Sequence, residues 1–160
     1  MAKQGHTDHR NRISTLLIKC VLATIAQSPS GAILGNVYVE LDSRPFPDVG
    51  WSDFVVVILC WWIDRLAALT RGQKTAVLSF MDGPFEVRAS DYDGTTAEIE
   101  LVRRGTRSTT LAVARINTLT LLSSIELVAA DVIAVCDRHS WDSDALERLR
   151  ESVRRERVQH

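Results

Sequence analysis

The segment that most constrains the fold of this chain is WSDFVVVILCWWIDRLAALTRG, which spans residues 51–72. Ten uninterrupted apolar residues, Phe54 to Ile63, run directly into Asp64 and Arg65. A membrane-spanning helix needs roughly 20 apolar residues, so this run is too short to cross a bilayer. Apolar side chains point in almost every direction around the helix, which is typical of a helix buried on several sides. We therefore expect a central core helix with one thin solvent-facing stripe, made of Asp53, Val57, Cys60, Asp64, Ala67 and Arg71.

The ends of this helix and its two tryptophans give further expectations. Ser52 can cap the first turn, and Asp53 would then lie at the positive end of the helix dipole. Gly72 is a suitable C-terminal stop. Trp61 and Trp62 point about 100° apart, so at least one of them should pack on a sheet. The alternative is that one tryptophan helps to form a partner-binding groove, because tryptophan is enriched in binding hot spots.

Two strands are expected before the helix. Residues 13–27, ISTLLIKCVLATIAQ, follow a charged start and could be compared with a signal peptide, but Lys19 and Thr24 interrupt the apolar run and no small-residue cleavage pattern follows. We interpret this segment as a strand. Apolar and polar residues then alternate over residues 37–42, which predicts a second strand that ends at Pro45 and Pro47.

A meander of four strands is expected after the helix. Turn signals at residues 81–84, 91–94 and 103–106 separate strands at residues 75–80, 85–91, 95–103 and 107–115. Pro84 lacks an N–H, so a four-residue loop from Met81 to Pro84 is expected, with Gly83 in an unusual backbone conformation. One face of the sheet should be apolar, formed by Phe85, Val87, Ala89, Ala97, Ile99, Leu101, Leu111 and Val113. The other should face water, with Glu86, Arg88, Glu98 and Glu100, and with Arg88 near Glu98 across the strands.

Two helices are expected to close the chain. Residues 116–140 carry one broad apolar stripe at helical spacing. The stretch SWDSDALERLRESVRRER follows, in which Asp142 can cap a last helix that ends in the basic cluster Arg154, Arg155 and Arg157. The chain is therefore predicted to be an α+β protein. Its antiparallel sheet, made of the N-terminal strands and the four-stranded meander, would pack on the central helix and the two C-terminal helices.

Composition bounds the organisation and the function classes. At 160 residues the length fits one domain, which we place at residues 13–158 after a flexible tail at residues 1–12. The net charge of −1 gives no electrostatic footprint for nucleic acid. Cys20, Cys60 and Cys136 lie in apolar runs without ligand spacing, so we expect buried reduced thiols and a cytoplasmic protein.

The sequence contains no GxGxxG, GxxxxGK(S/T), HExxH or GxSxG motif and no EF-hand loop. DYDG, residues 91–94, resembles a piece of a calcium loop, but the later ligands are missing. His6 and His9 lie in the tail, so we expect no metal and no cofactor. A carboxylate pair for catalysis stays open as an alternative, because four aspartates could meet in space: Asp53, Asp64, Asp82 and Asp91.

The ordered motifs RPFP (44–47), WSDF (51–54), WW (61–62) and FMDGPF (80–85) resemble those of a family of small, single-domain, uncharacterised bacterial proteins. The resemblance covers about residues 37 to 140. Its motifs are structural, so it transfers no functional residue. By analogy of fold type, small α+β proteins of this kind include immunity proteins that bind and neutralise a cognate toxin.

These observations favour a non-enzymatic protein-binding protein, most concretely an immunity protein that occludes a toxin. An acidic surface would suit a toxin that is basic where it meets phosphate. The candidate partner-binding residues are Glu86, Glu98 and Glu100 on the water-facing side of the sheet, and Asp82, Asp91 and Asp93 in the loops. A small hydrolase-like enzyme that uses carboxylates and a structural or regulatory homodimer are the alternatives. No membrane partner is expected.

Overall fold

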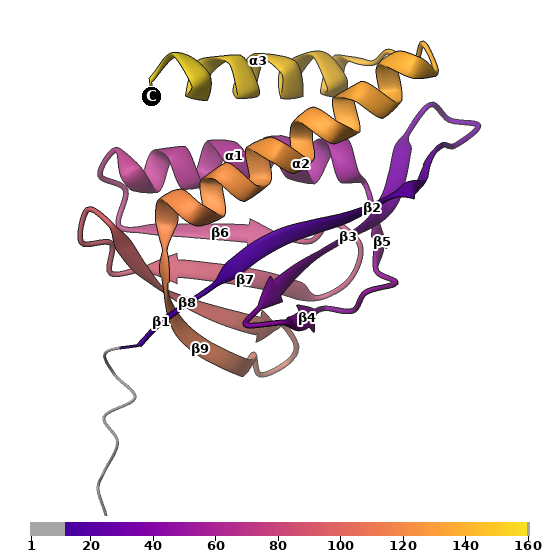
Figure 1. Ribbon diagram of the computed structural model, residues 1–160. Coiled ribbons are helices and arrows are strands. Elements are labelled where there is room, and N and C mark those ends of the chain that lie inside the picture. The colour runs from indigo at the N-terminus through magenta and orange to yellow at the C-terminus, as the bar shows by residue number, and fades with distance from the viewer. Residues whose placement is uncertain (1–11, 160) are drawn as a thin grey trace, which may run out of the picture.

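The computed structural model describes residues 12–159 and shows an α+β protein (Figure 1), as the sequence predicts. The helices are Val55–Thr70 (α1), Thr118–Arg138 (α2) and Asp144–Val158 (α3). The strands are Ile13–Ser14 (β1), Leu16–Gln27 (β2), Ile33–Leu41 (β3), Arg44–Phe46 (β4), Ser52–Asp53 (β5), Thr75–Ser79 (β6), Phe85–Ser90 (β7), Thr96–Arg103 (β8) and Thr109–Asn117 (β9). The expected tail lies outside the described residues except for Arg12, as do His6 and His9.

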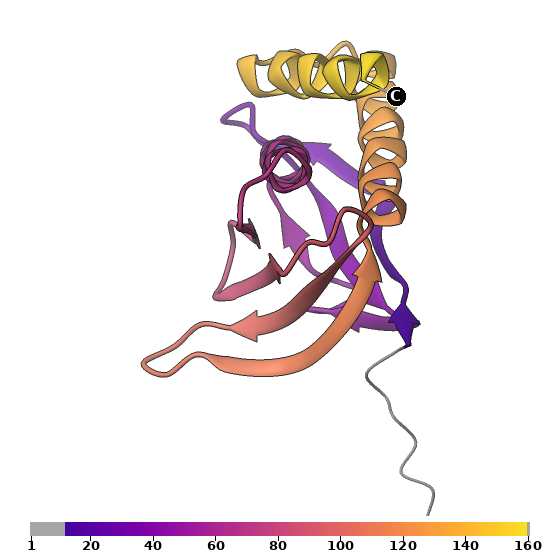
Figure 2. The ribbon, with the colours of Figure 1, turned by 90° about the vertical axis from the view of Figure 1, so that its left-hand side faces the viewer.

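The strands divide between two sheets, where the sequence suggested one. Sheet A has the order β1-β9-β8-β7-β6 and contains the whole predicted meander; its β1 is parallel to β9, and its other pairs are antiparallel. Sheet B has the order β2-β3-β4, with β5 also paired to β3. Figure 2 shows the hairpin of β8 and β9 curving strongly around the base of the molecule. The two sheets therefore meet along a seam instead of forming one surface.

The segment after β3 turns back where the sequence predicted an end at Pro45. Asp42 and Ser43 both adopt positive φ, 46° and 70°, as the central residues of a tight two-residue hairpin do. Residues Arg44–Phe46 then pair with β3 as an edge strand. Proline is tolerated on an edge strand when its nitrogen faces away from the neighbouring strand. Pro45 therefore belongs to β4 and does not terminate the sheet.

Helix α1 is the central core helix that the sequence predicts, but its start and its exposed stripe differ. Ser52 and Asp53 pair with β3, and Phe54 takes the N-cap position without a side-chain cap. The helix ends at Thr70, before Gly72 with φ of 115°. Helix α3 covers part of the expected stripe, so the exposed residues of α1 are Trp61, Asp64 and Arg65. Figure 2, which views α1 end-on, shows it between α3 and the strands.

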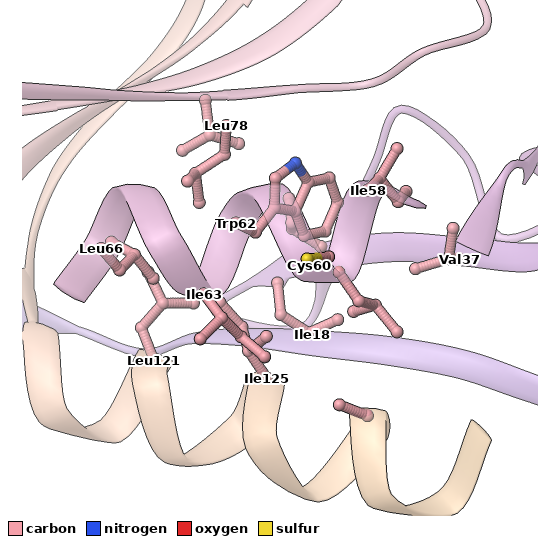
Figure 3. Packing of buried hydrophobic residues seen from close by; sticks show 14 of the residues in the cluster. Ile18, Val37, Ile58, Cys60, Trp62, Ile63, Leu66, Leu78, Leu121 and Ile125 are labelled. Atoms are coloured by element: carbon pink, nitrogen blue, oxygen red, sulfur yellow. The ribbon is translucent and has the colours of Figure 1, made fainter. Parts of the chain in front are cut away.

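The core of the molecule forms around α1 (Figure 3). Trp62 is fully buried, and its indole N–H donates to the carbonyl oxygen of Ser79 at 2.9 Å. Its ring meets the ring of Phe80 edge-on, with the centroids 5.0 Å apart. One tryptophan thus packs on the sheet, as the sequence predicts, while its neighbour Trp61 stays 45% exposed.

Helices α2 and α3 lie close to the positions that the sequence predicts. Helix α2 packs along β2, where Ser124 accepts a hydrogen bond from the Ile18 N–H at 2.6 Å and so covers the outer edge of sheet B. Helix α3 begins one residue later than expected, because Ser143 and not Asp142 accepts from the Leu146 N–H. Helix α2 is also the one helix of the described chain that is long and apolar enough to span a membrane, a property that core helices of soluble proteins share.

The three cysteines are free thiols in the described chain, as expected. Cys60 and Cys136 are buried, and Cys20 is partly buried beside β3. Burial raises the pKa of Cys20 to about 11, with a smaller contribution from Asp131, and it also raises the pKa of the other two thiols. Because the thiolate is the reactive form, these cysteines are poor nucleophiles at neutral pH.

Met81 to Pro84 form the predicted four-residue loop between β6 and β7, which a hydrogen bond from the Phe80 N–H to the Phe85 carbonyl closes. Gly83 has φ of 95°, and a Cβ there would lie 2.6 Å from the Trp51 ring. Gly83→Val should lower the free energy of unfolding by about 2–5 kcal/mol, from backbone strain and from displacement of that ring.

Gly94→Val is the matched control, since Gly94 has φ of 100° but open space around it. Strain alone should lower the free energy of unfolding of this variant by about 1–3 kcal/mol. Urea unfolding of both variants measures the difference. Equal losses would show that the Trp51 ring gives way at no cost.

Candidate functional site

The water-facing side of sheet A carries more apolar surface than the sequence predicts, because the side chains of β9 point to the faces opposite to those expected. A bulge shifts the register of β8 and β9 between Leu101 and Val102. Core residues of β8 therefore lie opposite Ala112, Ala114 and Ile116. Leu111 and Val113, which were expected in the core, are 54% and 56% exposed instead. We call this side the outer face; it includes Val77, Arg88, Glu98, Glu100, Leu111 and Val113.

Cross-strand pairing arranges the outer face in transverse rows. One row runs from Val77 to Arg88, Glu100 and Val113 across the four meander strands. The neighbouring row places Glu98 beside Arg115. Arg88 is thus directly opposite Glu100, and Glu98, which the sequence places near it, is its diagonal neighbour on β8. No ion pair of Glu98 or Glu100 is present within the described chain, so both carboxylates are available to a partner.

Glu86 does not belong to the available acidic row. Its side chain is only 7% exposed and lies between two arginines. The Nε atom of Arg88 is 2.6 Å from one carboxylate oxygen, and that of Arg104 is 3.6 Å from the other. This carboxylate is neutralised within the fold, so we assign it to the stability of the sheet.

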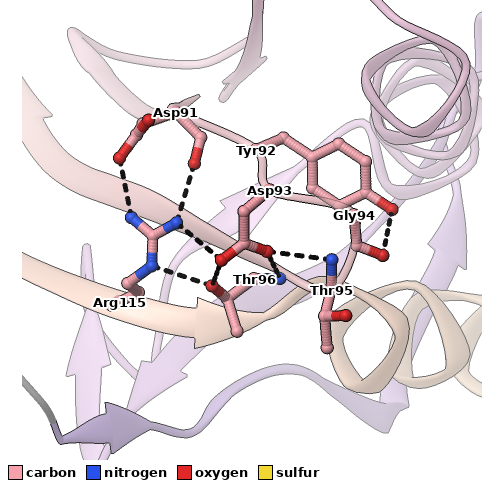
Figure 4. Close-up of polar contacts among 7 residues, drawn as sticks. All are labelled: Asp91, Tyr92, Asp93, Gly94, Thr95, Thr96 and Arg115. Atoms are coloured by element: carbon pink, nitrogen blue, oxygen red, sulfur yellow. Dashed lines mark hydrogen bonds and ion pairs between the residues drawn. The ribbon is translucent and has the colours of Figure 1, made fainter.

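Asp91 and Asp93 are also engaged, by Arg115 (Figure 4). Arg115 approaches Asp91 at 2.9 Å and Asp93 at 3.1 Å. Asp93 also accepts hydrogen bonds from the N–H groups of Thr95 and Thr96, which hold the pKa of its carboxyl well below the usual range. The stretch that resembles a calcium loop therefore surrounds the guanidinium of Arg115, which supplies the positive charge.

Asp82 lies at the opposite end of the sheet, in the loop between β6 and β7. Its backbone N–H donates to the carboxylate of Asp53 at 3.1 Å, while its own side chain has no bond or ion pair with another described residue. Asp64 instead contacts Ser152 of α3 at 3.1 Å. Asp53 and Asp82 are thus neighbours, whereas Asp64 and Asp91 bond in two other parts of the fold. The structure therefore does not bring together all four aspartates that the sequence leaves open as a catalytic alternative.

A groove of about 630 Å³ lies where the two sheets meet, between β4 and β9. We call it the seam groove. Its charged lining residues are Arg12, Asp42 and Arg44, and its apolar ones include Phe46, Leu111 and Val113. Asp42 accepts a hydrogen bond from the Thr15 N–H at 2.9 Å, which, with the hydroxyl of Ser14, lowers the pKa of its carboxyl.

The two walls of the seam groove differ in their hydrogen-bonding capacity. Thr118 N–H donates to the Thr95 carbonyl, so these two residues are a hydrogen-bonded pair at the end of the ladder of β8 and β9. Hydrogen-bonded and non-hydrogen-bonded pairs alternate along antiparallel strands, which makes Glu100 and Val113 a non-hydrogen-bonded pair. By that alternation, the N–H and C=O of Val113 point away from β8. On the other wall, the tight turn makes Leu41 and Arg44 the bonded pair, so the backbone of Pro45 faces outward without a donor. The backbone of β9 can therefore form hydrogen bonds with an added strand, whereas β4 offers no N–H donor at Pro45.

A second groove of about 500 Å³ lies beside the exposed tryptophan. Trp61, Asp64, Arg65 and Ala68 of α1 line one side, and Val77 and Ser79 of β6 line the other. This arrangement corresponds to the partner-binding alternative that the sequence leaves open for one tryptophan. It lies on the other edge of sheet A from the seam groove.

No cluster of three potential metal ligands occurs among residues 12–159. The chain matches no family model, no curated protein and no solved structure.

Sequence reasoning missed the seam groove and the exposed side chains of β9. The motif RPFP was visible, but the pattern of a strand followed by prolines indicated an end instead of an edge strand. The two-residue step Asp42-Ser43 before Arg44 is a turn signal that could have revealed the hairpin. Nothing in the sequence of one strand shows which strand of another sheet lies beside it.

Proposed function

We propose that this protein is a non-enzymatic protein-binding protein that uses the outer face of sheet A, and most concretely an immunity protein that occludes a toxin. One observation carries the proposal: Leu111 and Val113, each more than half exposed, lie on a well-formed strand beside the unpaired carboxylates Glu98 and Glu100. Exposed apolar side chains rimmed by charge are typical of a surface that another protein covers.

The charges of this surface favour recognition of one partner over nonspecific hydrophobic association. Glu98 and Glu100 are the two members of the expected acidic row on the sheet that no arginine neutralises by an ion pair within the described chain. Complementary charges speed encounter and select the right partner, while desolvated apolar side chains supply affinity. A toxin with a basic nucleic-acid site would present the matching charge.

Binding to the partner captured from the native host tests the proposal. Glu98→Lys/Glu100→Lys should weaken binding about tenfold or more, mainly by slower association and with altered salt dependence. Leu111→Asp/Val113→Asp should weaken it further, since charge would enter the apolar part of the interface. Each Kd is measured by calorimetry, and circular dichroism checks the fold.

Two matched variants control for nonspecific effects. Asp131→Lys/Glu151→Lys reverses two exposed charges on the helices, and Leu127→Asp adds a charge at an apolar residue of α2 that is 69% exposed. Both should keep the wild-type Kd. If the controls weaken binding as much as the outer-face variants do, this face is not the site. For the immunity function, co-expression should rescue cells from the product of a neighbouring toxin gene, and the outer-face variants should not.

A further inference from the structure

We propose that the seam groove takes one extended segment of the protein partner, a strand that carries carboxylate side chains and pairs with the outer edge of β9. The inference deepens the proposed function and rests on it, because the outer face and the seam groove share Leu111 and Val113. A partner that covers the outer face therefore reaches this groove without crossing other structure.

The backbone of β9 supplies the recognition. Strand β1 pairs with β9 only at Arg115 and Ile116, and the outward N–H and C=O groups of Val113 have no partner among the described residues. An extended peptide adds to such an edge by main-chain hydrogen bonds, and the alternate side chains give specificity. Ala112 and Ala114 line the groove with small side chains, which leaves room for the inward-facing side chains of an added strand.

The opposite wall limits the occupant to a single strand. Strand β4 borders the groove and is blunted by Pro45, which offers no N–H to a neighbour. A second copy of this chain would bring its own β9 with β8 attached, and that attached strand would lie about 5 Å beyond the added one, on the side where β4 already borders the groove. The groove therefore fits one isolated extended segment, and not the edge of another sheet.

The charges of the groove select the side chains of that segment. Arg12 and Arg44 line it, and neither forms an ion pair with another described residue. Asp42 is the one acidic lining residue, and Thr15 already donates a hydrogen bond to its carboxylate. Arg12 and Arg44 also stabilise the charge of Asp42. Two guanidinium groups against one carboxylate leave the groove with excess positive charge, which favours a segment in which carboxylates alternate with apolar residues.

The probe is a capped heptapeptide of alternating valine and glutamate, compared with the same peptide carrying lysine in place of glutamate. Titration of the full ¹⁵N-labelled chain should shift the amide signal of Val113 and its neighbours saturably with the glutamate peptide. The lysine peptide should bind at least ten times more weakly. Arg12→Glu/Arg44→Glu should invert this preference.

A backbone substitution tests the pairing itself. Val113→Pro removes an N–H that has no partner in the sheet, whereas Val113→Ala removes side-chain atoms and keeps that donor. The proline variant should lose at least tenfold in affinity for the glutamate peptide, and the alanine variant less than threefold. Circular dichroism checks folding, and the charge inversion decides alone if the proline variant does not fold.

Three outcomes overturn the inference. The first is equal binding, or no binding, of the two peptides. The second is a Val113 amide that is protected from hydrogen exchange in the free monomer and loses protection when residues 1–11 are deleted, since the groove would then hold the chain's own amino terminus. The third is a dimer in sedimentation that Val113→Pro dissolves, since a second copy would then fill the groove.

If the captured partner binds normally to Arg12→Glu/Arg44→Glu and to Val113→Pro but not to Glu98→Lys/Glu100→Lys, this inference fails while the proposed function stands.

Discussion

Asp53→Ala should lower the free energy of unfolding by about 3–5 kcal/mol. The carboxylate of Asp53 is almost fully buried and accepts three hydrogen bonds, from the indole N–H of Trp51 at 3.1 Å and from the backbone N–H groups of Phe54 at 2.7 Å and Asp82 at 3.1 Å. It thus joins the start of α1 to the loop between β6 and β7. Removing the acceptor leaves three partly buried donors without it, at up to about 1–3 kcal/mol each.

Two further variants separate this role from a general sensitivity of this part of the chain to the loss of a carboxylate. Asp53→Asn keeps the shape and one acceptor oxygen, so we expect a smaller loss, about 1–3 kcal/mol. Asp48→Ala changes an exposed aspartate in the segment between β4 and β5 and should alter stability by no more than about 0.5 kcal/mol. Urea unfolding followed by circular dichroism measures all three. A loss for Asp53→Ala no greater than that for Asp48→Ala would refute the structural role of this carboxylate.

The role of Asp53 illustrates what sequence patterns could and could not predict. Apolar periodicity located α1 and most other elements, because a helix or strand that buries one side must repeat its apolar residues with the period of its backbone. The start of α1 was wrong because Ser52-Asp53 pairs with Gly35-Asn36 of β3. That pairing joins segments that are far apart in the sequence, and local capping rules do not include it.

The candidate site also depends on contacts between segments that are far apart in the sequence, which local patterns do not predict. The acidic residues were recognisable, but their availability depends on arginines from other strands: Arg104 reaches Glu86, and Arg115 reaches Asp91 and Asp93. The orientation of Leu111 and Val113 depends on a bulge that adds one residue to β9 opposite β8. A one-residue shift turns every later side chain to the other face, so an apolar pattern alone assigned them to the core.

The other large effect is expected at the paired tryptophans of α1. Trp62→Ala should lower the free energy of unfolding by about 3–5 kcal/mol, because it empties a fully buried site and removes the donor to Ser79 carbonyl. Trp62→Phe keeps most of the apolar contact and loses that hydrogen bond, so its loss should be smaller, about 1–3 kcal/mol.

Trp61→Ala is the matched control for Trp62→Ala, because it removes the same type of side chain from the neighbouring position of α1. Trp61 is 45% exposed beside the groove of α1 and β6, so its removal should cost less than about 1.5 kcal/mol. Thermal and urea unfolding of the three variants give the comparison. Equal losses at the two positions would contradict the assignment of Trp62 to the core and Trp61 to the surface. A small loss at Trp61, together with weaker partner binding, would move the proposed interface from the outer face to that groove, because an exposed tryptophan with no stabilising role is a strong candidate for a binding hot spot.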